Sequence, residues 1–305
     1  MRQLSRLRTE MAMGAHHLAA RLFPDRLMLG VEFGIIARRC LPDWIKGDTL
    51  VRPDAPQRSI TVRQIAASLG RAPETVRRHV NDLRDRGALV VTEAGVMLAS
   101  TAANEPTVAT YLRGTHDLFL RLIEDLAHTS DYMLPVRDAP AFGFADIAER
   151  AIDTLLLPVD TFRLPGSGLM FLLWGALTAV AVRTVTYDPV LARRYADAIP
   201  PDTLRIGISL RRLAEALHIP YATAWRQMQA LHESGLVTRL GGEQWTVLTA
   251  NLMRDAALAV HTPPSTFTLR KVRELALLGL DPAHAGDHYS AGRPPLPDLG
   301  LADPA

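Results

Sequence analysis

Two stretches of this 305-residue chain carry arginine, hydroxyl and amide side chains at spacings that place them on one outward face of a helix. In the stretch from Ile60 to Gly87 these side chains are Thr75, Arg77, Arg78 and Asn81. Arginine pairs with guanine and asparagine with adenine through two hydrogen bonds, and arginine and threonine also bind phosphate oxygens. A helix face of this kind indicates contact with a double-stranded nucleic acid, whereas ordinary solvated arginines are the alternative interpretation.

The same motif occurs twice. Ile60–Gly87 and Ile208–Gly235 align without a gap over 28 positions, and eight of these positions are identical. A repeat at a fixed offset indicates a duplicated structural unit. The apolar positions stay apolar in both copies, whereas the outward positions differ: Arg78 matches Arg226, but Trp225 stands in the place of Arg77.

Each copy predicts two helices joined by a tight turn. In the first copy Thr61 and Gln64 have the spacing of a capping box, which starts a helix. Gly70 ends that helix, Pro73 suits the first turn of the next one, and Gly87 closes it.

The second copy follows the same rules, with Ser209 as the cap and Gly235 as the closing residue. Two short β-prone runs follow each copy, around Gly95 in the first and around Gly241 in the second. These runs predict a β-hairpin with a glycine turn. A helix-turn-helix followed by a hairpin is the order of a winged helix.

The segment from Gln64 to Val91 resembles the winged helix-turn-helix of bacterial transcriptional regulators of the GntR, MarR and IclR type. The resemblance implies that the second helix of each copy enters the major groove of DNA. We therefore expect a mainly α fold with two tandem winged helix-turn-helix domains, each a three-helix core with a β-hairpin wing, joined by a helical scaffold.

Composition shifts and amphipathic patterns divide the chain into six expected segments. They are an N-terminal helical region (1–58), winged helix one (59–100), a helical connecting region (101–204), winged helix two (205–250), trailing helices (251–280) and a flexible tail (281–305). Helices are predicted at 27–39, 107–126, 144–156, 169–183, 253–260 and 269–278.

The resemblance and the outward spacing together assign the candidate DNA-binding residues. In the first copy they are Glu74, Thr75, Arg77, Arg78 and Asn81 for base edges, with Thr61 and Arg71 for phosphates. In the second copy they are Ser209, Tyr221, Thr223, Trp225, Arg226 and Gln229, with Arg239 in the hairpin.

Trp225 leaves three interpretations open: contact with thymine methyls or sugar, packing on a neighbouring helix, or an anchor for another protein. We accordingly expect the first copy to read DNA, and the second to read a different half-site or to dock a protein. Because the two copies differ, the DNA site is expected to be an imperfect palindrome or two unlike half-sites.

Composition limits the classes of function and the cellular location that the chain can be assigned to. The net charge is only +2, and 32 of the 34 basic residues are arginine, so arginine number alone is weak support for nucleic acid binding. The single cysteine, Cys40, excludes an internal disulfide and fits a reducing cytoplasm. The uncharged segment 164–182 contains proline and glycines at its start, which favours a buried helix over a membrane span.

No phosphate-binding glycine loop, metal-ligand spacing or nucleophile motif appears, so we expect neither an enzyme nor a cofactor. The leading hypothesis is a cytoplasmic, sequence-specific transcriptional regulator whose partner is double-stranded DNA. A homodimer is possible, and no association with a membrane is expected. The alternatives are a plasmid-type replication initiator and a winged-helix protein–protein adaptor.

Overall fold

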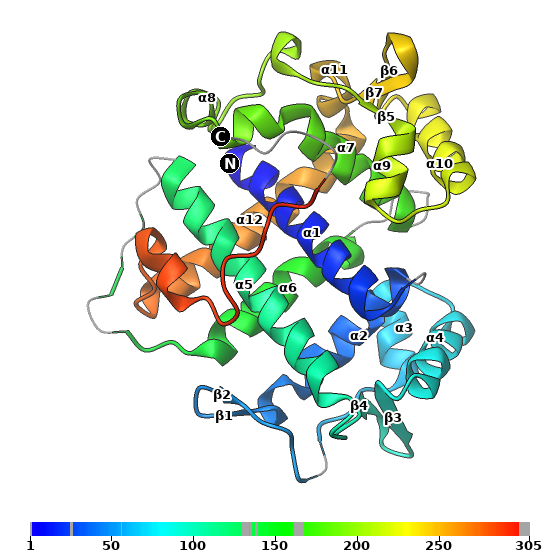
Figure 1. The fold of residues 1–305 in the computed structure, drawn as a ribbon, viewed down its shortest axis with the longest axis vertical. Helices are drawn as coiled ribbons and strands as arrows, with labels where there is room; N and C mark the ends of the chain where they lie inside the picture. Colours follow the sequence, from blue (N-terminus) through cyan, green and yellow to red (C-terminus); the bar gives the residue numbers. More distant parts are fainter. Residues whose placement is uncertain are drawn as a thin grey trace.

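The computed structural model describes residues 2–24, 27–55, 57–129, 134, 136–137, 140–161 and 168–298. The expectation of a mainly helical protein is confirmed, with small antiparallel sheets at the periphery (Figure 1). The described elements fall into two sets that follow each other along the chain.

The first set is called unit one. It contains α1 (Arg2–Leu22), α2 (Leu27–Cys40), η1 (Leu41–Asp43), β1 (Ile45–Lys46), β2 (Thr49–Leu50), α3 (Val62–Leu69), α4 (Pro73–Asp85), β3 (Leu89–Thr92), β4 (Gly95–Leu98) and α5 (Glu105–Thr129).

The second set is called unit two. It contains α6 (Phe144–Thr161), α7 (Gly168–Tyr187), α8 (Pro189–Arg194), η2 (Asp202–Leu204), β5 (Ile208–Ser209), α9 (Leu210–Ala216), α10 (Tyr221–Glu233), β6 (Thr238–Arg239), η3 (Gly241–Glu243), β7 (Gln244–Thr246), α11 (Thr249–Leu252) and α12 (Asp255–Leu277). A final short helix, η4 (Pro282–His288), follows it.

The predicted helix signals of the first copy are confirmed. The Thr61 hydroxyl accepts the backbone N–H of Gln64, and the Gln64 side chain accepts the N–H of Thr61, which completes the capping box. Gly70 and Gly87 end α3 and α4 in the left-handed conformation, and Pro73 is the first residue of α4.

The second copy repeats this geometry. Ser209 caps α9 by accepting the backbone N–H of Arg212, and Gly235 ends α10 in the left-handed conformation. Helices α4 and α10 begin and end at matching positions of the sequence repeat.

The strands also correspond. Ile60 forms a bridge to Val96 of the β3–β4 hairpin, and β5 pairs with β7 of the β6–β7 hairpin through Ile208 and Trp245. In each unit the isoleucine two residues before the first helix of the repeat therefore adds an edge to the hairpin. We call α2, α3, α4, β3 and β4 head one, and α7, β5, α9, α10, β6 and β7 head two.

The correspondence extends beyond the heads. The leading helix of each unit packs on its own trailing helix, since α1 contacts α5 and α6 contacts α12. Each leading helix also crosses to the other unit, because α1 packs on α7 and α6 packs on α2. The two units thus interlock through reciprocal contacts, and the two hairpins lie at opposite ends of the molecule (Figure 1).

Each head has its own apolar core. Head one buries Phe33, Ile65, Val80 and Leu83, with Trp44 beside them, and the α5 side chain Tyr111 covers this core. Head two buries an equivalent set led by Trp174, Leu213, Met228 and Trp245. A third core holds the scaffold together between α1, α5, α6 and α12.

Helix α7 is long and apolar enough to cross a membrane by length and composition, and 61% of that apolar window is buried inside the protein. Its first half packs in the core of head two, through side chains that include Leu173, Trp174 and Leu177. The Trp174 indole N–H donates to the carbonyl of Leu236, which follows α10. These contacts support the buried-helix interpretation of the uncharged segment.

The expected flexible tail is wrong for residues 281–298. This segment packs along α5, where the buried Asp117 carboxylate accepts the backbone N–H groups of Ser290 and Ala291 at 2.8 and 2.7 Å. Arg293 forms ion pairs with Glu124 and Asp125. Polar side chains of α5 hold this segment by binding its backbone. Order of this kind does not need apolar residues in the segment, so its low apolar content was a misleading sign of flexibility.

A second correction concerns the trailing helices predicted at 253–260 and 269–278. They form a single helix, α12, that runs through Pro263 and Pro264. A proline inside a helix removes a backbone hydrogen bond, which normally favours a break. Here Ser265, Thr268 and Val272 are buried in the scaffold, and this packing keeps the helix continuous.

Candidate nucleic-acid interface

Helices α4 and α10 lie along the same edge of the molecule (Figure 1). Their other faces are fixed in the cores, because Val76 and Val80 of α4 are buried, as are Ala224 and Met228 of α10. This one-sided burial results from apolar residues at helical spacing. It leaves the intervening polar residues at the surface of both helices.

In head one the five candidate base-contact residues lie together on α4. Glu74, Arg77 and Arg78 are exposed, and Thr75 and Asn81 are half-buried beside them. Arg77 forms an ion pair with Glu74 at 2.5 Å, which balances its charge. Arg78 makes no ion pair or hydrogen bond with the described residues, so its guanidinium group is available to a ligand.

Arg71 does not lie where a phosphate contact was expected. Its guanidinium group is 3.4 Å from Glu32, a fully buried residue of α2 that also receives the His79 ring nitrogen at 2.7 Å. Burial raises the pKa of Glu32, while His79 and Arg71 oppose that shift. Arg71 therefore fixes the turn before α4 to α2. The spacing of residues in the sequence did not indicate that Glu32 would be its buried partner.

The two candidate residues at the helix starts, Thr61 and Ser209, act as caps. The hydroxyls of Thr61 and Ser209 accept backbone N–H groups within their own helices. The Thr61 hydroxyl also donates to the Gln64 side chain. Both residues hold helix N-termini at the surface, where backbone N–H groups favour an anion.

In head two Trp225 packs within its own head. Its ring lies edge-on to the buried Trp245 of β7 at a centroid distance of 6.1 Å, and it stacks with Tyr221 at 6.4 Å. The Arg239 guanidinium lies over both tryptophans, at 5.7 and 5.8 Å. Arg211 lies over Tyr221 at 5.7 Å. This aromatic–arginine cluster joins α9, α10 and the hairpin, so Trp225 packs on the hairpin of its own head, whereas one of its three interpretations had placed it against a neighbouring helix.

The remaining candidates of head two surround this cluster. Arg226 is exposed and makes no ion pair with the described part of the chain, as is the case for its counterpart Arg78. Thr223 and Gln229 are half-buried at either side.

The two heads differ in how much positive charge is left unbalanced. In head one, carboxylates neutralise Arg77, Arg84 and Arg86. In head two no described carboxylate lies within ion-pair distance of four arginines, Arg211, Arg212, Arg226 and Arg239. Head two therefore has four arginines without an ion-pair partner among the described residues, whereas head one has two, Arg63 and Arg78.

Sequence reasoning missed Arg63 and Arg212 as candidate ligands. Both are exposed on the first helix of their repeat and make no side-chain ion pair in the described structure. Their position, two or three residues after the capping residue, was the available signal.

Helix α1 fixes head two through histidines. The His16 and His17 rings donate to the carbonyls of Leu217 and Ala216 at the end of α9, at 2.9 and 2.7 Å. The His218 ring lies edge-on to His17 at 6.2 Å. Burial lowers the pKa of His16 from its usual 6.5 to about 4, so the ring is neutral at pH 7.

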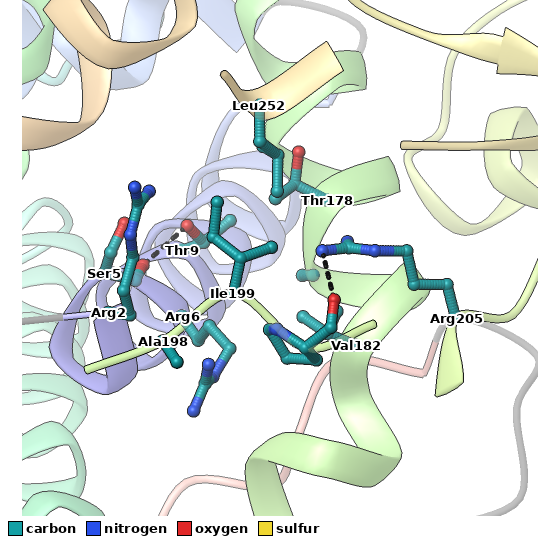
Figure 2. Close-up of a pocket in the computed structure, with 12 residues that line it drawn as sticks. Arg2, Ser5, Arg6, Thr9, Thr178, Val182, Ala198, Ile199, Arg205 and Leu252 are labelled. Carbon is teal, nitrogen blue, oxygen red and sulfur yellow. Dashed lines mark hydrogen bonds between the residues drawn. The ribbon is translucent and has the colours of Figure 1, made fainter. Parts of the chain in front are cut away.

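A small cavity of about 40 Å³ lies between α1, α7 and the segment before β5, with three arginines around it (Figure 2). Burial lowers the pKa of Arg6 to about 10, and the charges of Arg205 and Arg2 add to this shift. Figure 2 shows the guanidinium groups of Arg2 and Arg6 pointing to opposite sides. Arg205 donates to the Pro200 carbonyl and pairs with Asp202. These donors do not converge, which makes this cavity a gap in the packing.

Among the residues that the structure describes, no three His, Cys, Asp or Glu side chains lie together in a way that would hold a metal ion. The chain matches no protein-family model, no curated protein and no solved structure.

Proposed function

We propose that this chain is a sequence-specific DNA-binding protein whose two heads are winged helices. On this proposal α4 and α10 are the recognition helices, and the β3–β4 and β6–β7 hairpins are the wings. The role that fits such a reader best is the regulation of transcription.

The observation that carries the proposal is the pair Arg78 and Arg226. They occupy equivalent positions of the repeat, both are exposed, and both lack a described acidic partner. Arginine on a recognition helix bonds guanine O6 and N7 together, a contact worth about 1–3 kcal/mol of base discrimination. The repeat retains this residue on an outward face where most neighbouring positions have changed.

The interlocked units support a fixed geometry for two half-sites. Because α1 packs on α7 and α6 packs on α2, neither head is joined to the scaffold by a single linker. Reciprocal contacts of this kind relate the heads by an approximate twofold axis, as in symmetric dimers that read inverted repeats. One chain therefore has the heads that two copies of a single-head protein would supply.

The protein–adaptor alternative has less support. Three features favoured it: Trp225, Glu93 at the tip of the first hairpin and the low net charge. Of these, Trp225 is engaged with Trp245 and Arg239. The unbalanced arginines of head two favour a polyanion as the partner of that surface.

The test starts with selection of binding sites from a random duplex library by the purified full-length chain. Fluorescence anisotropy then measures affinity for the selected duplex at several salt concentrations, with Arg78→Gln and Arg226→Gln as variants. Arg194→Gln is the matched control, because this exposed arginine lies on α8, on the edge opposite α10 (Figure 1). The proposal expects a steep loss of affinity with salt and selective losses in the two variants. Failure to enrich any sequence, with a folded protein, refutes it.

A further inference from the structure

A large cavity lies where head one meets the scaffold. It has a volume of about 410 Å³, within the range of about 300–1,000 Å³ typical of small-molecule sites. Its walls come from α2, α3, α6 and α12, together with Pro42 of η1 and with Arg58 and Ile60 of the segment before α3. The cavity therefore touches both the first helix of the repeat and the helices that carry it.

The cavity is lined by apolar residues, which we call the floor, and by the charged residues Arg38, Arg39, Arg58 and Asp153, which we call the rim. Ile35, Leu69, Leu156 and Phe267 supply apolar surface, together with Pro42 and Leu157. Such a floor excludes a small hydrated ion and suits a ligand with an apolar body.

The rim holds two arginines with donors to spare. Arg39 is exposed and uses only its Nε–H, which donates to the Ser59 carbonyl at 3.1 Å. Arg58 is 54% exposed in its side chain and forms an ion pair with Asp43 through Nε at 3.8 Å, which leaves its terminal N–H groups without a described partner. The third arginine, Arg38, is neutralised by Glu149 and Asp153.

The reciprocal arrangement of the units shows that this space is particular to head one. At the equivalent place in unit two, His16 and His17 of α1 close the junction by bonding the Ala216 and Leu217 carbonyls. The repeat aligns those two residues with Ser68 and Leu69, which line the cavity in unit one.

The leucines of α6 replace the histidines of α1 at this junction. The side chains of Leu156 and Leu157 carry no hydrogen-bond donor like the histidine rings, and the cavity lies at this junction beside α3. One of two equivalent joints is thus closed by side chains, and the other contains a cavity.

We propose that this cavity binds a small organic anion, a carboxylate, sulfonate or phosphate group on an apolar or aromatic body. The anionic group pairs with Arg39 and Arg58, and the body lies against Leu156 and Phe267. A bound ligand joins α3 to α6 and so fixes head one on the scaffold. Binding itself is independent of the proposed function, whereas its effect on DNA rests on that function.

The test uses two dyes of similar shape. 8-Anilinonaphthalene-1-sulfonate carries the anion, and N-phenyl-1-naphthylamine is its neutral counterpart; fluorescence titration gives both affinities for the full chain without DNA. Ser68→Trp fills the cavity from an exposed position, and Arg39→Gln/Arg58→Gln removes the rim charge. Arg113→Gln, an exposed arginine of α5, is the control.

We expect Ser68→Trp to weaken both dyes at least tenfold, and the double glutamine variant to weaken the sulfonate about tenfold while sparing the neutral dye. Thermal melting of each variant confirms that it is folded. Equal sulfonate affinity in a folded Ser68→Trp protein overturns the site, and equal losses for both dyes in the double variant overturn the anion.

DNA binding is measured separately, by anisotropy on the selected duplex with and without the sulfonate. If the dye binds the cavity but leaves DNA affinity unchanged, the proposed effect of the ligand on DNA binding is refuted, and the binding site itself is not. Absence of any selective DNA binding counts against the proposed function and leaves the dye result valid.

Discussion

Gly70 and His218 hold the same left-handed backbone conformation, with φ of 59° and 53°, at the matching position of the two repeats. In head one a glycine adopts this conformation at no steric cost, whereas in head two a side chain must adopt it. Head two thus keeps the backbone conformation of the turn although histidine replaces the glycine that this conformation favours. His218 places its ring beside His17 of α1, in the junction that fixes head two.

His218→Gly is expected to stabilise the protein against urea by about 1 kcal/mol. The substitution relieves left-handed strain of about 1–2 kcal/mol, but glycine also raises the conformational entropy of the unfolded chain, which offsets part of this gain. Gly70→Ala is the reciprocal change and should destabilise by about 1 kcal/mol, since no atom lies near an added Cβ and only the backbone angle is unfavourable. A clear loss of stability in His218→Gly would mean that the ring contacts outweigh the strain.

The sequence predicted the local parts of this fold well. Capping residues, turn glycines and apolar spacing act within a few residues, so Thr61, Gly70 and Pro73 marked the helix ends correctly. The crossing of α1 onto α7 depends on side chains about 170 residues apart, for example the pairing of Arg183 with Glu10, and no local pattern carries it. The same limit explains Arg71, whose buried partner Glu32 lies on another helix.

The pH dependence of stability tests the α1–α9 junction. His16 has a pKa of about 4 in the folded protein against 6.5 when unfolded, so the unfolded chain binds more protons between these values. Its contribution is fully present above pH 6.5 and is lost as the pH falls toward 4. We expect the wild type to lose about 2 kcal/mol from this group between pH 7.5 and 5.

The measurement is urea unfolding of wild type and His16→Gln at both pH values. Glutamine keeps an N–H donor for the Leu217 carbonyl but does not titrate, so the pH-dependent loss should shrink by that amount. His128→Gln, at an exposed position, should retain the wild-type slope. An unchanged slope in His16→Gln would contradict the assigned burial.

Arg77 and Arg78 should differ in their effect on DNA. Arg78→Gln is expected to weaken the selected duplex about tenfold or more and to relax the base at one position. Arg77→Gln should have the smaller effect, because Glu74 already holds that guanidinium. Anisotropy titrations against duplexes with single base changes separate the two; equal losses would show that the ion pair opens on DNA.

Trp225→Ala should affect stability and one half-site together. Removing a half-buried indole from Trp245 and Arg239 is expected to cost about 2 kcal/mol of unfolding free energy. Footprinting should show protection lost at the half-site of head two and kept at the other. Trp225→Phe preserves most of the ring contact and is the matched control, while full protection in the alanine variant would exclude a role for this cluster in binding.

The C-terminal segment should contribute to folding through Asp117. Asp117→Ala leaves the N–H groups of Ser290 and Ala291 without their acceptor and removes a buried carboxylate bonded to His116, a loss of about 3 kcal/mol. Asp287→Ala, at an exposed position of the same segment, should change stability by less than about 0.5 kcal/mol. Similar urea midpoints for both variants would argue against the packed segment.

The most direct test of the central claim is hydroxyl-radical footprinting of the wild-type chain on the duplex that it selects from a random library. The account predicts two protected half-sites in inverted orientation and unlike in sequence, with centres about 34–36 Å apart along one face of the helix. Arg78→Gln should weaken protection of one half-site and Arg226→Gln that of the other. A single protected half-site, two half-sites in direct orientation, or no protection at any salt concentration would contradict it.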